Sequence, residues 1–130
     1  MLTSLIIAYF LLHGGASALY TSQLDHLESA IKKEVPAEAT RKQALAIVSQ
    51  AQAANKTFTD DRKKMAATLA SALGSRTATA EQIEGAMKPL LAADSTVTAK
   101  MVDTYVELRP VIGAADWAKV FPAPGAPPAK

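Results

Sequence analysis

The sequence predicts an all-α protein in which an N-terminal membrane helix precedes an antiparallel hairpin of two long helices with short flanking helices. Residues 2–20 contain no charged residue. Two later segments repeat apolar side chains in alternating steps of four and three residues, as amphipathic helices do. Hydrophobic residues form 49% of the chain but aromatic residues only 5%, and alanine is the commonest apolar residue. This composition favours closely packed helices over sheets.

The first twenty residues have the character of a signal peptide and the length of an anchor. The apolar run Leu5–Leu12 is followed by the triplet Ala16–Ala18, a pattern typical of secretory signal peptides. At roughly 1.5 Å per residue, a helix over residues 2–20 reaches about 28 Å, close to the thickness of the hydrocarbon core. We expect residues 1–20 to be retained as a transmembrane anchor in the bacterial inner membrane, with the bulk facing the periplasm. Cleavage is the alternative.

Small side chains in this segment predict a contact with a partner. Gly14 and Ala18 are four residues apart and Gly15 lies beside them. Such a face lets a second transmembrane helix approach closely, although a signal peptidase would also recognise small residues here. A retained anchor implies membrane lipid and other membrane-protein subunits as partners.

Residues 21–121 are expected to form the helical hairpin domain. A short amphipathic helix carries Leu24, Leu27 and Ile31 on one face and is expected to end near Val35. Pro36 suits the first turn of the next helix, because a first-turn residue needs no backbone N–H donor.

The first long arm is predicted by an apolar seam that continues until Gly74, a residue typical of helix ends. The seam consists of Ala44, Val48, Ala51, Asn55, Phe58, Arg62, Met65, Leu69 and Ala72.

The second arm begins at a predicted capping box formed by Thr79 and Gln82. Pro89 predicts a kink, and the weak helix formers that follow predict a break near residues 92–95. The seam of this arm consists of Ile83, Met87, Leu90, Asp94, Val97, Met101, Tyr105, Leu108 and Ile112.

A last short helix is expected over residues 114–121, with Trp117, Val120 and Phe121 covering the open end of the hairpin. Residues 122–130 contain four prolines and are expected to form an extended tail.

Charged residues inside the two seams predict a structural pair. If the hairpin turns near Arg76, Arg62 and Asp94 come within one helical turn of each other. We expect them to pair, because an unpaired charge facing a seam costs several kcal/mol. The alternative is that each side chain reaches solvent separately at the edge of its seam.

The inventory of reactive groups is poor. The chain has no cysteine, which excludes disulfides, thiolate nucleophiles and cysteine-based metal sites. Three methionines lie on the seams and are interpreted as core residues. The net charge is +2, and the Lys and Arg residues are interleaved with Asp and Glu along the chain. No nucleic-acid surface is therefore indicated. We therefore expect no catalytic residue, no cofactor, no metal, no nucleic acid and no small-molecule substrate.

Residues 106–121 read Val-Glu-Leu-Arg-Pro-Val-Ile-Gly-Ala-Ala-Asp-Trp-Ala-Lys-Val-Phe. With the two arms before it, this segment resembles the periplasmic CpxP, Spy and metal-resistance-sensor group over residues 36–121. In that group the second long helix ends in a segment of the form L-T-P-E-Q, where this chain has Gly-Ala-Ala-Asp in place of Thr-Pro-Glu-Gln. The resemblance implies a helical hairpin that binds other proteins. Metal sensing is not implied, because the histidine-rich ligands have no counterparts here.

Two functions follow as hypotheses. In the first, the chain is not an enzyme but a single-span structural or accessory subunit of a larger membrane protein complex. In the alternative, it is a periplasmic chaperone-like or stress-sensor protein of the CpxP/Spy type.

Overall fold

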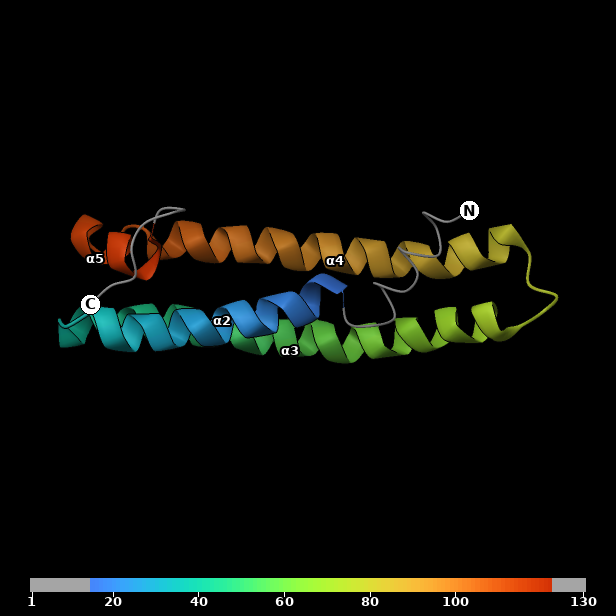
Figure 1. The fold of residues 1–130 in the computed structure, drawn as a ribbon, viewed down its shortest axis with the longest axis horizontal. Coiled ribbons are helices and arrows are strands. Elements are labelled where there is room, and N and C mark those ends of the chain that lie inside the picture. Colours follow the sequence, from blue (N-terminus) through green and yellow to red (C-terminus); the bar gives the residue numbers. More distant parts are fainter. Residues whose placement is uncertain (1–14, 123–130) are drawn as a thin grey trace.

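The computed structural model describes residues 15–122, and these form four α-helices. They are α2 (Gly15–Glu34), α3 (Glu38–Gly74), α4 (Ala80–Leu108) and α5 (Ala114–Val120). Helices α3 and α4 run antiparallel as a long hairpin, and α2 lies along only the half of the hairpin that ends at α5 (Figure 1). The predicted all-α fold and its helical hairpin are confirmed for this part of the chain.

Helix α3 forms as its seam predicts. Its 37 residues extend over about 55 Å at roughly 1.5 Å per residue. It begins at Glu38, so Pro36 lies in the connection before the helix instead of in its first turn. Every buried residue of α3 belongs to the predicted seam; these are Ala44, Val48, Ala51, Asn55, Arg62 and Leu69.

Helix α4 begins at the predicted capping box. The backbone N–H of Gln82 donates to Thr79 Oγ1 at 3.1 Å, and the backbone N–H of Thr79 donates to Gln82 Oε1 at 3.0 Å. The predicted break near residues 92–95 is wrong, because α4 continues through Pro89 to Leu108. Pro89 is exposed, so the carbonyl group that loses its N–H partner can be solvated.

The end of the hairpin is closed by α5 and aromatic side chains. Val120 and Ile112 are buried, and Trp117 and Phe121 pack against the same core. The ring of Phe121 lies 4.3 Å from that of Trp117 and meets the ring of Tyr105 edge-on at 5.4 Å. The predicted covering of the open end by residues 114–121 is confirmed.

The N-terminal membrane helix is not supported. Residues 15–20 of the expected anchor form the first turns of α2, which packs against α3 and α4. Ser17 is only 1% exposed within this packing. Among residues 15–122, no helix combines the length and the apolar character that crossing a membrane requires. Residues 1–14 of the anchor and residues 123–130 of the tail lie outside the described residues.

The core consists of two clusters at different positions along the hairpin. We call residues 63–93 the distal half, which contains the turn, and the remainder of the described chain the proximal half. The proximal cluster joins side chains of α2, α3, α4 and α5, including Leu24, Val48 and Met101. The distal cluster consists of Leu69, Met87 and Leu90 with their partly buried neighbours on α3 and α4.

Candidate functional site

A buried polar cluster joins α2 to α3. The amide Nδ2 of Asn55 donates to Thr21 Oγ1 at 2.7 Å and to the backbone carbonyl of Ser17 at 3.2 Å. The hydroxyl of Ser17 donates to Asn55 Oδ1 at 3.1 Å and lies 2.6 Å from Thr59 Oγ1. Among the described residues, every buried side-chain nitrogen and oxygen has a hydrogen-bond partner. The cluster therefore joins α2 to α3 through hydrogen bonds between side chains of the two helices.

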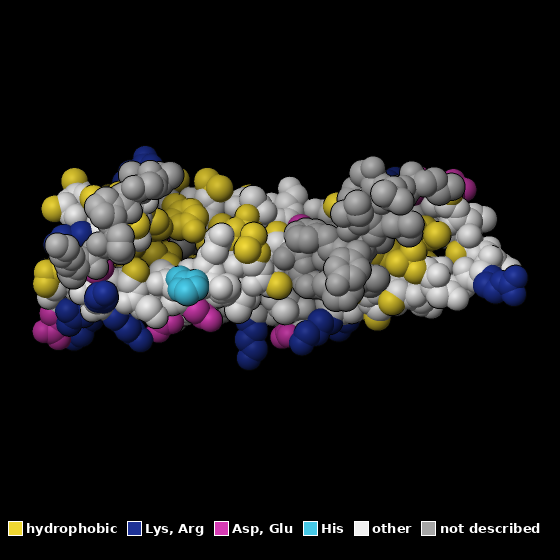
Figure 2. Space-filling model, in the orientation of Figure 1, with side chains coloured by type: hydrophobic (Ala, Val, Ile, Leu, Met, Phe, Trp, Pro, Cys, Tyr) yellow, Lys and Arg dark blue, Asp and Glu magenta, His cyan; other side chains and the backbone are white. Residues whose placement is uncertain are grey.

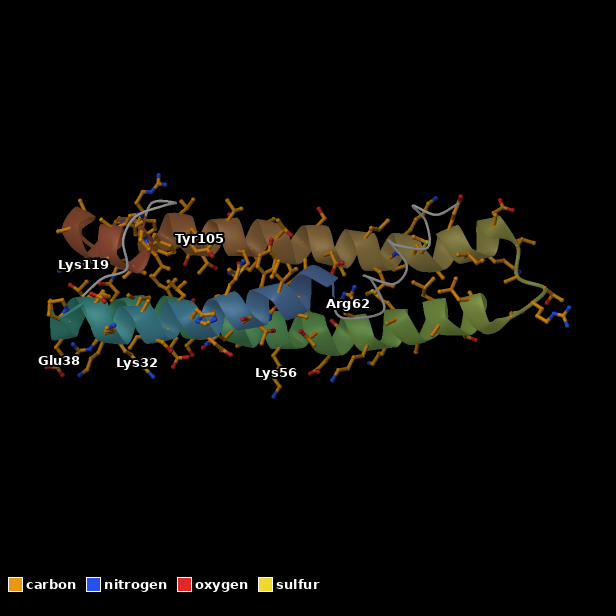
Figure 3. The ribbon with its side chains drawn as sticks, viewed as in Figure 1. Lys32, Glu38, Lys56, Arg62, Tyr105 and Lys119 are labelled. Atoms are coloured by element: carbon orange, nitrogen blue, oxygen red, sulfur yellow. The ribbon has the colours of Figure 1, made fainter. Side chains whose placement is uncertain are left out.

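The ion pair predicted from the seams is formed. The Nε of Arg62 donates to Asp94 Oδ1 at 3.0 Å, and the Nη2 of Arg62 donates to Asp94 Oδ2 at 3.4 Å. The side chains are only 5% and 12% exposed. Arg62 lies between the two arms where α2 begins (Figure 3). The pair therefore marks the boundary between the proximal and distal halves.

A hydrogen-bond chain connects this pair to α2. The hydroxyl of Tyr20 donates to Thr98 Oγ1 at 3.1 Å, and the Thr98 hydroxyl donates to the backbone carbonyl of Asp94 at 2.8 Å. The lack of charge in residues 2–20 places Tyr20 in the expected anchor. Extending the spacing of Leu24 and Ile31 toward the N-terminus would have placed Tyr20 and Ser17 on the buried face of the same helix.

The predicted partner-contact residues are only partly described. Gly14 lies outside the described residues, Gly15 is the first residue of α2, and Ala18 is exposed on that helix. Leu19 beside it is 55% exposed. Ala18 and Leu19 are therefore not covered by the hairpin, and the contact expected through Gly14, Gly15 and Ala18 stays a prediction.

The outer face of α4 carries an uncharged row that the seams of the two arms do not predict. Val102 and Val106 are 55% and 59% exposed, and they lie four residues apart on one face of the helix. Ser95 and Ala99 continue the same row and are also exposed. In the view of Figure 2, charged side chains gather along the edge formed by α2 and α3. The row on the outer face of α4 is therefore an exposed, uncharged surface that could contact another protein.

Two clefts lie beside α2. One lies between α2 and α3, has a volume of about 390 Å³, and is lined by polar and charged side chains that include Asp25, Lys56 and Asp60. The other lies between α2 and α5, also has a volume of about 390 Å³, and is lined by His26, Tyr105 and other side chains. Residues 15–122 contain no group of three or more His, Asp or Glu residues placed to hold a metal ion.

Two side chains near these clefts have shifted pKa values. Burial, and then the nearby Tyr20, raise the pKa of the Tyr105 hydroxyl. The hydrogen bond from Gln52, followed by the hydrogen bond and positive charge of Lys32, lowers the pKa of Glu28. Both shifts hold the side chain in its usual state near neutral pH, so neither provides a proton donor or acceptor tuned for catalysis.

No family model matches the chain, and neither a curated protein nor a solved structure matches it. The resemblance of residues 36–121 to the CpxP/Spy group therefore stays a prediction.

Proposed function

We propose that the chain is a non-catalytic accessory subunit that binds a larger protein assembly through the outer face of α4. The observation that carries this proposal is the uncharged row of Ser95, Ala99, Val102 and Val106. Single exposed apolar residues are common on protein surfaces. Exposed uncharged residues that recur every three or four positions over several helical turns instead form a continuous stripe. Such a stripe is the pattern by which one helix binds the apolar face of another.

The chemistry of the partner follows from this row. Valine and alanine offer a shallow apolar surface without a long side chain, which suits close contact with a second helix. Asp103 and Glu107 lie on the same helix beside the row and are exposed. A partner helix with an apolar face and a basic edge would match both features.

The proposed location is outside the cytoplasm, at the membrane. The signal-like pattern of residues 5–18 supports export. Binding through α4 does not require the single membrane span that the lack of charge in residues 2–20 predicts.

Photo-crosslinking tests the proposal. A photoreactive amino acid is placed at Val106, and in a matched control at Lys56, which is exposed on α3 (Figure 3). In cells that naturally contain the chain, Val106 should yield a discrete adduct with one protein species, and Lys56 should not. The substitution Val102→Glu should remove the adduct. Equal labelling from both positions, or an adduct that survives Val102→Glu, would contradict the proposal.

The chaperone-like function is the second candidate, and the same exposed row favours it because unfolded clients bind exposed apolar surface. A chaperone should suppress aggregation of several unrelated clients at near-stoichiometric ratios, and Val102→Glu with Val106→Glu should abolish that effect. An accessory subunit should leave client aggregation unchanged while still forming its discrete adduct.

A further inference from the structure

The uncharged row on α4 belongs to a longer row whose spacing is the same in both directions. Extended toward the N-terminus, it runs from Lys88 to Val106 in steps of four, three, four, three and four residues. The members of this extended row are all exposed; they are Lys88, Ala92, Ser95, Ala99, Val102 and Val106. We propose that, until the larger partner binds, the extended row is covered by the extended row of a second copy of the chain in antiparallel orientation. This inference rests on the proposed function, because it names what occupies the same surface in the free protein.

Antiparallel pairing matches the side chains of the extended row in size. Because the steps are symmetric, every member lies opposite one member of the second copy. Ala92 lies opposite Val102 of the second copy, and Ser95 lies opposite Ala99 of the second copy. Alanine and serine let the two backbones approach closely, and each valine fills the space opposite a smaller side chain. At the ends, the apolar stem of Lys88 can lie along Val106 of the second copy.

The charges beside the extended row favour the antiparallel orientation. Asp103 and Glu107 are exposed near its Val106 end, and as like charges four residues apart they repel each other. Lys88 lies at the other end. Among residues 15–122, none of these three side chains forms an ion pair within its own chain. Antiparallel pairing brings Lys88 beside Asp103 of the second copy at both ends of the contact, whereas parallel pairing would place Lys88 against Lys88.

The fold leaves this face of α4 accessible to a second copy. Val97, Met101 and Thr104 are buried on the opposite face of the helix. The contact therefore involves one helix from each copy, over about 27 Å from Lys88 to Val106 at roughly 1.5 Å per residue. So narrow a contact buries little area and predicts a weak dimer. A larger partner that binds the row can displace such a dimer by mass action.

Sedimentation velocity of the purified full chain tests the dimer. The sedimentation coefficient should rise with protein concentration, and Val102→Glu should keep the chain monomeric. Lys88→Glu should raise the dissociation constant of the dimer roughly tenfold, because two repulsive contacts replace two attractive ones. Combining Lys88→Glu with Asp103→Lys should restore the dimer. The matched control is Lys64→Glu, which changes an exposed lysine of α3 that also lies four residues after a carboxylate, and it should leave the dissociation constant unchanged.

Disulfide formation between chains tests the register, and the natural chain contains no cysteine that would interfere. One preparation carries Ser95→Cys and another carries Ala99→Cys. Under mild oxidation, a mixture of the two should form disulfide-linked dimers roughly tenfold faster than either preparation alone, because only the mixture places two thiols opposite each other. Non-reducing electrophoresis measures the product, and circular dichroism verifies that each variant is folded.

A purified chain that stays monomeric as its concentration rises, or a dimer that survives Val102→Glu, would overturn the proposal. Equal effects of Lys88→Glu and Lys64→Glu would also overturn it, as would a mixture of cysteine variants that reacts no faster than its components. If Val102→Glu fails to fold, the Lys88 variants decide the test. Crosslinking from Val106 in cells is measured separately. An adduct with a different protein supports the proposed function even if the purified chain is monomeric, whereas an adduct of the chain with itself alone supports the dimer and contradicts the proposed function.

Discussion

The proximal and distal halves of the hairpin are built from the same two helices but are held together differently. In the proximal half α2 joins the two arms, and Asn55, Ser17 and Thr59 form hydrogen bonds between α2 and α3. In the distal half, the described contacts come from α3 and α4 alone. The Arg62–Asp94 pair lies between them. The difference indicates that buried polar contacts restrict where α2 docks, whereas the distal parts of α3 and α4 pack through apolar side chains.

This contrast has a physical basis. Apolar contacts are tolerant of small shifts, because their free energy depends mainly on the area removed from water. A buried amide or guanidinium tolerates little displacement, since losing its partner costs the full desolvation of the group. Polar residues at the boundary therefore restrict the register in which α2, α3 and α4 can combine.

Loss of the boundary ion pair is expected to have the largest effect. Arg62→Ala should lower the free energy of unfolding by about 3–5 kcal/mol, because it leaves the nearly buried Asp94 carboxylate without its counter-charge. Urea unfolding followed by circular dichroism measures the change. Both halves should be destabilised, because the pair joins α3 to α4 at the boundary between the proximal and distal halves.

Two variants control this experiment. Lys42→Ala removes an exposed pair with Glu38 and should leave the unfolding free energy nearly unchanged. The double variant Arg62→Met with Asp94→Leu replaces the pair by apolar side chains and should recover most of the lost stability. If Arg62→Ala is no more destabilising than Lys42→Ala, the pair does not have the boundary role assigned to it.

Much of the hairpin could be predicted because its determinants are local. The four-three repeat is visible in the chain, and its positions Val48, Leu69 and Leu90 are fully buried. The capping box at Thr79 needs only two residues three apart. Counting equal numbers of residues along both arms from the turn brings Arg62 and Asp94 within one helical turn of each other, so their pairing could be predicted.

Other features could not be predicted because they depend on contacts between distant segments. The lack of charge in residues 2–20 favoured a membrane helix, whereas the burial of Ser17 depends on Asn55, 38 residues away. The break expected after Pro89 does not occur. Thr96 and Thr98, expected to weaken the helix, donate their hydroxyls to carbonyls four residues earlier within α4, at Ala92 and Asp94.

An intermediate effect, confined to the proximal half, is expected for Asn55→Ala. This change removes the amide that contacts both Ser17 and Thr21, and it should cost about 1–3 kcal/mol because their polar groups lose partners. Hydrogen exchange should show faster exchange in α2, with little change at residues 65–73 and 83–90. Uniform acceleration along the whole chain would contradict the division into two halves.

Gln52→Ala is the matched control for Asn55→Ala. Gln52 lies one turn earlier on α3 and also hydrogen-bonds to α2, through the exposed carboxylate of Asp25 and the half-buried carboxylate of Glu28. Water can reach both carboxylates when Gln52 is removed, and Glu28 keeps its ion pair with Lys32, so exchange in α2 should change far less than in Asn55→Ala. Similar effects in both variants would mean that burial of the polar cluster is unimportant.

The smallest effect is expected at the far end of the distal half. Thr79→Ala removes the side-chain acceptor of the capping box and should cost about 1 kcal/mol. Faster exchange should be confined to the first turn of α4, because the backbone N–H of Gln82 loses its partner there. Thr68→Ala, which removes an exposed hydroxyl inside α3, should cost nothing measurable because alanine favours helices. If Thr79→Ala also accelerated exchange in α2, the two halves would unfold as one unit. The Arg62–Asp94 pair would then not separate two halves of different stability.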